Sequence, residues 1–113
     1  METRQLRQLK TIVDTYGTNP QIDMMIEEAS ELTKALLKYR RKSNSESSTG
    51  EEMMALRDAV IDEIADTKIM LAQMEILFGC AGEVEVQVSH KIDRQMERLS
   101  KRTIRETGGE NCE

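Results

Sequence analysis

The sequence predicts an all-α protein, an antiparallel four-helix bundle-like domain. Three observations carry this prediction. Apolar residues recur at helical spacing over long runs, and Pro20 is the only proline among 113 residues. Aromatic residues make up only 3% of the chain, and eight methionines can take over part of their packing role because the methionine side chain adapts to irregular spaces.

The first helix is expected over roughly residues 2–16 and the second over about 20–42. Gly17 separates them, since glycine commonly follows the last turn of a helix, and Pro20 suits the first turn of the next one. The apolar stripe of the first helix consists of Leu6, Leu9, Val13 and Tyr16. The expected apolar face of the second consists of Ile22, Met25, Ile26, Ala29, Leu32, Leu36 and Tyr39.

A polar stretch over residues 43–50 (SNSESSTG) is expected to form a loop, with Thr49 capping a third helix that runs to about Phe78. A break at 79–82 precedes a fourth helix over roughly 83–105. The alternating valines at 84, 86 and 88 also fit a strand, but the apolar spacing from Val88 to Leu99 is helical and overrules it. We therefore expect one domain over residues 1–106 and a disordered tail over 107–113.

The formal net charge of −5 disfavours a sequence-independent nucleic-acid binder, which normally carries a basic surplus. Cys80 and Cys112 lack metal-ligand spacing and are interpreted as reduced thiols. No apolar run approaches transmembrane length, and the N-terminus has no signal-peptide pattern. These features predict a cytoplasmic protein without nucleic-acid or membrane partners.

Two acidic motifs carry the chemistry. The second expected helix contains EEASE (27–31) and the third contains DEIAD (62–66). Residues three apart share a helix face, so Glu28 lies beside Glu31, and Glu63 lies beside Asp66. In projection Glu63 points into the apolar stripe of its own helix.

A carboxylate in an apolar seam is costly unless a cation or a proton compensates its charge. An oxygen-only ligand set without histidine or cysteine favours Mg²⁺, with Mn²⁺ possible. The spacing therefore makes candidate metal ligands of Glu28, Glu31, Glu63 and Asp66, although a single ExxE on a helix is also common without a metal. The flanking acids Glu27 and Asp62 are interpreted as solvated.

The ordered set of EEASELTKALLKYRR, DEIADTKIMLAQMEILFG and HKIDRQMERL resembles the MazG-like all-α nucleotide pyrophosphohydrolases, especially their short phage and prophage members. The resemblance covers roughly residues 16–100. It implies Mg²⁺-dependent cleavage of a nucleoside triphosphate between its α- and β-phosphates, giving the monophosphate and pyrophosphate. The family pattern of EExxE followed by ExxD matches Glu27, Glu28, Glu31, Glu63 and Asp66. By position, the resemblance implies that Glu28, Glu31, Glu63 and Asp66 are the metal ligands. The spacer at 43–50 is long for the family, and Ile92 follows Lys91 where phenylalanine is more usual.

Glu28 and Glu31 are alternatives for the residue that orients or deprotonates the attacking water. Lys38 lies on the same helical flank and is a candidate phosphate contact. A family basic pair matches Lys91 and Arg94, which begin a basic stripe on the fourth helix with Arg98 and Lys101. Each of these basic residues also fits an ordinary solvated surface.

Three other functions deserve comparison. A helical adaptor would explain the amphipathic helices but not Glu63 in an apolar stripe. A di-iron bundle needs Glu-x-x-His motifs, and His90 is the only histidine. A phosphoribosyl-ATP pyrophosphohydrolase shares the architecture and stays an alternative. The wide apolar faces of the second and third helices also predict a homo-oligomer, either a dimer or a tetramer.

Overall fold

The computed structural model describes the backbone of residues 1–111 and the side chains of residues 1–106. Within these residues the chain forms four helices and no strand: α1 (Thr3–Tyr16), α2 (Thr18–Ser43), α3 (Gly50–Phe78) and α4 (Ala81–Asn111). The all-α class is thereby confirmed. The chain divides into two units, Met1–Gly79 and the segment from Cys80 onward. Because each unit is described by itself, the bundle of all four helices stays a prediction.

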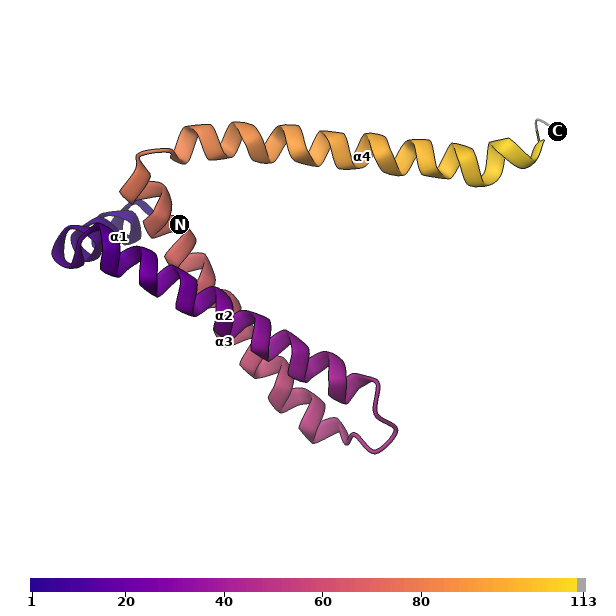
Figure 1. Ribbon diagram of the computed structural model, residues 1–113, viewed down its shortest axis with the longest axis horizontal. Helices are drawn as coiled ribbons and strands as arrows, with labels where there is room; N and C mark the ends of the chain where they lie inside the picture. Colours follow the sequence, from indigo (N-terminus) through magenta and orange to yellow (C-terminus); the bar gives the residue numbers. More distant parts are fainter. Residues whose placement is uncertain (112–113) are drawn as a thin grey trace. The chain divides into compact units, whose positions relative to one another are not determined.

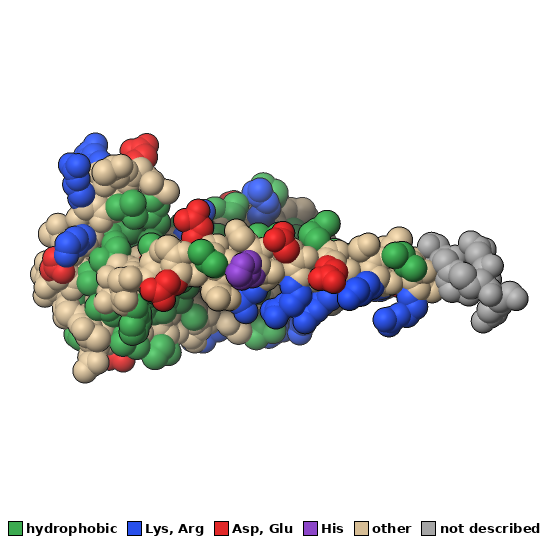
Figure 2. Space-filling model, turned by 90° about the horizontal axis from the view of Figure 1, so that it is seen from above, with side chains coloured by type: hydrophobic (Ala, Val, Ile, Leu, Met, Phe, Trp, Pro, Cys, Tyr) green, Lys and Arg blue, Asp and Glu red, His purple; other side chains and the backbone are tan. Residues whose placement is uncertain are grey.

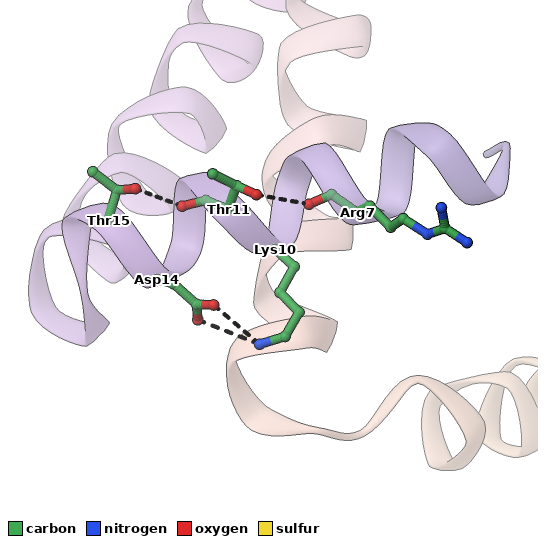
Figure 3. Close-up of polar contacts among 5 residues, drawn as sticks. All are labelled: Arg7, Lys10, Thr11, Asp14 and Thr15. Atoms are coloured by element: carbon green, nitrogen blue, oxygen red, sulfur yellow. Dashed lines mark hydrogen bonds and ion pairs between the residues drawn. The ribbon is translucent and has the colours of Figure 1, made fainter.

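Polar contacts within α1 hold its exposed side in helical register (Figure 3). The Lys10 ammonium lies 3.1 Å from the Asp14 carboxylate one turn away. The hydroxyls of Thr11 and Thr15 donate to the carbonyl oxygens of Arg7 and Thr11, at 3.1 and 2.6 Å. Such exposed pairs contribute little to stability, so α1 depends on its buried side.

The turn between α1 and α2 is a single residue, Gly17. Its φ of +85° is a conformation that side-chain-bearing residues rarely adopt. The Gly17 N–H closes α1 by donating to the Val13 carbonyl at 2.9 Å, and the Gly17 carbonyl accepts from Gln21 N–H at 3.2 Å. Pro20 falls in the first turn of α2, as expected, where its missing N–H costs nothing.

Helices α2 and α3 lie side by side as a long antiparallel hairpin (Figure 1). The Thr49 hydroxyl accepts a hydrogen bond from Glu52 N–H at 3.1 Å, and the Thr49 backbone is extended, as is usual at a helix N-cap. The predicted cap is thereby confirmed. The Lys42 ammonium of α2 lies 3.4 Å from the Glu52 carboxylate of α3. At the loop end of the hairpin, Thr49 therefore defines the start of α3, and the exposed Lys42–Glu52 pair joins the two helices.

The buried core of the first unit is small. It consists of Leu9, Val13, Ala35 and Met70. Along α2 the covered residues are buried Gln21 and Ala35 and half-buried Ile22, Met25, Glu28, Glu31 and Leu32. Ile26 and Leu36, expected on the apolar face, are instead 63% and 48% exposed. Within its own unit α2 packs only against α1 and α3, so a narrow stripe is covered and the rest of the broad apolar face stays exposed.

In the second unit α4 is helical from Ala81, and the alternating valines belong to this helix rather than to a strand. The helix includes residues 107–111 of the expected tail, while 112–113 lie outside the described residues. Charge pairs one turn apart support it, with Lys101 at 3.3 Å from Glu97 and Arg102 at 2.9 Å from Glu106. Across the described residues, no helix combines the length and the apolar character needed to cross a membrane.

Candidate metal centre

Three carboxylates meet across the α2–α3 hairpin. Glu28 of α2 and Glu63 and Asp66 of α3 each offer one oxygen, and these three oxygens all lie within 4.8 Å of one another. Each of the three side chains is half-buried. We call these residues the acid trio.

The trio lies in the seam because of its helical spacing. Glu28 occupies the covered stripe of α2, three residues after Met25 and four before Leu32. Glu63 occupies the corresponding stripe of α3, three residues after Val60 and seven before buried Met70, as its spacing predicts. Asp66 follows Glu63 by three residues and therefore shares its face. The packing of two apolar stripes brings the acids together.

Burial raises the pKa of the Glu28 carboxyl, and the neighbouring charges of Asp66, Glu63, Glu27 and Glu31 raise it further. Burial also raises the pKa of the Glu63 carboxyl, and the charges of Asp66, Asp62 and Glu31 add to this effect. The site therefore concentrates negative charge, and among the described residues no ion pair involves Glu28, Glu63 or Asp66.

Glu63 shows most directly that the carboxylates of the trio lack compensating partners. Its Oε2 is shielded from solvent and has no hydrogen-bond partner among the described residues. Thr67 Oγ1, one turn further along α3, is likewise shielded and unpartnered within that part of the chain. A buried carboxylate oxygen without a partner is unusual in a folded protein, and a bound cation or a proton would satisfy it.

The donor set fits a hard divalent cation. All three ligand atoms are carboxylate oxygens, which Mg²⁺ prefers. Mg²⁺ commonly retains several waters and binds through few protein carboxylates together with substrate phosphates. A three-carboxylate site is sufficient for that mode of binding.

Glu31 is not among the three converging ligands, although it was predicted as one. Its charge still raises the pKa of both Glu28 and Glu63, so it lies near the trio. Its Oε1 lies 3.4 Å from the Lys34 ammonium. Sequence reasoning missed Lys34, even though the i,i+3 spacing from Glu31 indicates the pair.

Lys38 is separated from the trio along α2. Lys38 follows Glu28 by ten residues of helix, an axial distance of about 15 Å. Lys38 instead lines a cavity of about 420 Å³ near the loop end of the hairpin, together with Arg41, Lys42, Glu52, Ala55 and Leu56. The structure thus groups Lys38 with other basic side chains rather than with the trio.

Lys91 and Arg94 are exposed residues of α4. Figure 2 shows Lys and Arg side chains gathered along one flank of this helix. Because α4 belongs to the second unit, the contact of Lys91 and Arg94 with a phosphate stays a prediction.

A second cavity, of about 640 Å³, lies among α1, α2 and α3. Its lining includes two glutamines, Gln21 and Gln73, that are each only 3% exposed. Neither amide Oε1 has a hydrogen-bond partner among the described residues. The sequence analysis did not select these glutamines. Gln21 is seven residues before Glu28 and Gln73 is seven after Asp66, and this spacing places each glutamine on the same helix face as a trio member.

Comparison with known proteins adds no identification. No family model, no curated protein and no solved structure matches this chain. What the fold and the site define is an all-helical protein with an acid trio in a helical hairpin.

Proposed function

We propose that this protein is a Mg²⁺-dependent nucleoside triphosphate pyrophosphohydrolase that converts a (deoxy)nucleoside triphosphate to the monophosphate and pyrophosphate. The observation that carries the proposal is the convergence of Glu28, Glu63 and Asp66 from two helices, with Glu63 Oε2 left without a partner in the described chain. The similarity of the acidic motifs to MazG-like enzymes supports the reaction type.

In this proposal the acid trio holds the cation. Bound Mg²⁺ would neutralise phosphate charge and lower the pKa of a coordinated water. Glu31 lies outside the converging ligands but within electrostatic reach of them. It is therefore the better candidate to orient the attacking water, whereas Glu28 is already engaged in the trio.

Lys34 is the basic residue closest to Glu31 in the sequence, and its ammonium lies 3.4 Å from the Glu31 carboxylate. In the proposed reaction Lys34 orients the Glu31 carboxylate. Lys91 and Arg94 remain the proposed phosphate contacts. Lys38 would reach only the distal end of an extended substrate.

The proposal includes self-association. Apolar side chains of α2 and α3 remain exposed after the first unit has packed; among them are Ile26 (63%), Leu36, Leu37, Ile61, Ile64 and Leu71 (52%). A small domain with this much apolar surface gains stability by burying it against a second copy. Either a dimer or a tetramer would bury these apolar side chains.

The same exposed surface favours a second candidate function, a non-catalytic helical adaptor that binds another protein. Phosphoribosyl-ATP is an alternative substrate within the enzyme class. One screen separates all three: the eight standard NTPs and dNTPs, together with phosphoribosyl-ATP, are incubated with Mg²⁺ and scored for pyrophosphate. Release from a standard nucleotide supports the proposal, release only from phosphoribosyl-ATP favours that alternative, and no release from any substrate favours the adaptor.

A further inference from the structure

One side of α3 carries an exposed apolar stripe at heptad spacing. Ile64, Leu71 and Phe78 follow one another at intervals of seven residues, which is about two turns of helix. These side chains are 44%, 52% and 63% exposed. Large apolar residues that recur every seven positions are typical of a seam at which two helices pack. The stripe therefore has the form of a helix–helix contact that its own unit leaves largely uncovered.

Helix α1 does not cover this stripe, because it lies against another side of α3. On α3 the cavity beside α1 is lined by Ile69, Met70 and Gln73. Ile69 and Gln73 are each two positions from Leu71, so at about 100° per residue they point about 160° away from it. The stripe thus lies on the side of α3 that faces away from α1.

Two charged side chains border the stripe, exposed Lys68 and half-buried Glu75. Neither forms an ion pair among the described residues. No position three or four residues from Lys68 carries an acid, and none three or four residues from Glu75 carries a base. Their separation of seven residues is about 10 Å along the axis, too far for a direct pair within one helix. Both charges are therefore available to a partner on this side of α3.

The stripe and its charges are complementary to an antiparallel copy of themselves. Ile64 and Phe78 lie seven residues before and after Leu71, whereas Lys68 lies three before it and Glu75 four after it. In an antiparallel pair of α3 helices centred on Leu71, Ile64 falls opposite the partner's Phe78. Lys68 falls within one residue, about 1.5 Å, of the level of the partner's Glu75. A parallel pair would instead bring equal charges to the same level.

The two charges also border the same edge of the stripe. Lys68 follows Ile64 by four residues, and Glu75 follows Leu71 by four. Antiparallel helices that are related by a two-fold axis place this edge against itself, so each lysine meets a glutamate on the same side of the seam. Opposite charges are thereby paired twice in one contact.

We propose that α3 forms the interface with a second copy of this chain, as an antiparallel pair centred on Leu71 in which Lys68 pairs with the partner's Glu75. The two-fold symmetry of this pair is the commonest symmetry of protein dimers. The apolar stripe provides affinity, and the charge pairs select the antiparallel register, since like charges penalise the alternatives. The inference rests on the self-association within the proposed function, names the surface that mediates it, and is independent of the reaction catalysed.

Charge exchange tests the register. Lys68→Glu and Glu75→Lys each bring like charges together at two symmetric positions, so each should weaken the dimer by about tenfold. The double variant restores opposite charges and should return the dissociation constant to within about threefold of the wild-type value. Sedimentation equilibrium of the full-length protein measures these constants, and circular dichroism verifies folding. Arg4→Glu, on exposed α1, is the control and should leave the dimer unchanged.

Recovery in the double variant requires contact between copies, because the two residues do not reach each other within one helix. If both single variants dimerise as tightly as wild type, or if the double variant is as weak as the single ones, the assignment is overturned.

Cross-linking tests which residues face each other, in a background in which both native cysteines are replaced by serine. A short bismaleimide should join Leu71→Cys to its partner copy, whereas Ile69→Cys, which is 40% exposed on the other side of α3, should stay monomeric on a denaturing gel. Ile64→Cys and Phe78→Cys should cross-link poorly alone and efficiently when mixed. Equal cross-linking of Ile64→Cys alone and in the mixture indicates a parallel pair and overturns the assignment.

Other occupants of the stripe give different results. A monomeric wild type in which Leu71→Cys reacts slowly with a monofunctional maleimide shows that a segment of the same chain covers the stripe. A monomeric wild type in which this thiol reacts rapidly leaves the stripe for a different protein. Either result overturns the proposal.

The failure of this inference is separable from the failure of the proposed function. A dimer with these contacts that releases no pyrophosphate from any nucleotide supports the interface and removes the catalytic proposal. Pyrophosphate release by a protein that lacks these contacts leaves the enzyme proposal standing and removes the interface.

Discussion

Glu28 of α2 and Glu63 of α3 face each other across the hairpin, with one carboxylate oxygen from each within 4.8 Å. Asp66 completes the group, and burial raises the pKa of both glutamates. Two ionised carboxylates at this separation repel each other. The hairpin therefore stores a destabilising interaction that a cation would remove.

Replacing Glu63 tests the metal centre. Glu63→Gln removes one ligand charge with little change in volume, so Mg²⁺-dependent turnover should fall by at least about 100-fold, while the melting temperature without metal stays unchanged or rises. Calorimetric Mg²⁺ titration and circular dichroism measure the two effects. The control is Glu46→Gln, an exposed loop acid. Normal Mg²⁺ affinity and turnover in Glu63→Gln would show that the ligand assignment is wrong.

The stability of the metal-free protein should depend on pH through the same glutamates. The folded-state pKa of Glu63 lies above the ordinary value near 4.5, so the folded state holds this proton more tightly than the unfolded state does. The resulting stabilisation is complete below pH 4.5 and is lost as pH rises through the folded-state pKa.

The melting temperature of wild type relative to Glu63→Gln, followed over pH 4–8 in EDTA, should therefore decline with rising pH. Saturating Mg²⁺ should restore the melting temperature of the wild type at the upper end of this pH range. At the lower end Mg²⁺ should have no effect, because protons compete with the cation. If the melting-temperature difference between wild type and Glu63→Gln is independent of pH in EDTA, the Glu63 carboxyl does not link stability to pH.

The products distinguish the proposed bond cleavage from other triphosphate hydrolysis. Attack at the α-phosphate gives a monophosphate and pyrophosphate, whereas attack at the γ-phosphate gives a diphosphate and orthophosphate. Anion-exchange chromatography of a single reaction separates these species. A diphosphate peak at early times would exclude the proposed reaction.

Self-association should be obligatory. Ile61, Ile64 and Leu71 of α3 are between 44% and 52% exposed, so light scattering should give at least twice the monomer mass of 12.9 kDa. The double variant Ile61→Lys/Leu71→Lys should shift the mass toward the monomer, and Val86→Lys on α4 is the comparison substitution. A folded, active wild type at the monomer mass would contradict the prediction.

If the active sites borrow Arg94 across that interface, mixing Glu63→Gln chains with Arg94→Ala chains should restore part of the activity. Self-contained sites predict no recovery in the mixture. Unmixed samples of each variant provide the baseline.

The Thr49 cap should contribute measurable stability. Thr49→Ala removes the acceptor for Glu52 N–H, which typically costs about 1 kcal/mol and lowers the melting temperature of a domain this size by roughly 4–8 °C. Thr33→Ala is the matched control, because the Thr33 hydroxyl only bonds back to the Ala29 carbonyl within α2 and alanine is the better helix former. Equal melting temperatures for Thr49→Ala and wild type would show that the cap is dispensable.

Much of the local structure could be read from the sequence because its causes are local. The helical spacing of apolar residues, the positive φ required at Gly17 and the hydroxyl of Thr49 act within a few residues of chain, and the structure has helix ends at these positions. The presence of Glu63 in an apolar stripe is also a matter of spacing along one helix.

Only the tertiary structure decided which groups meet. The packing of α2 against α3 brings Glu28 to Glu63 and Asp66 but not Glu31, and no spacing along either helix alone determines that choice. Burial of Gln21 and Gln73 depends equally on three helices enclosing one cavity. A linear pattern specifies which face of a helix a residue occupies, whereas the partner of that face is determined by how the helices pack.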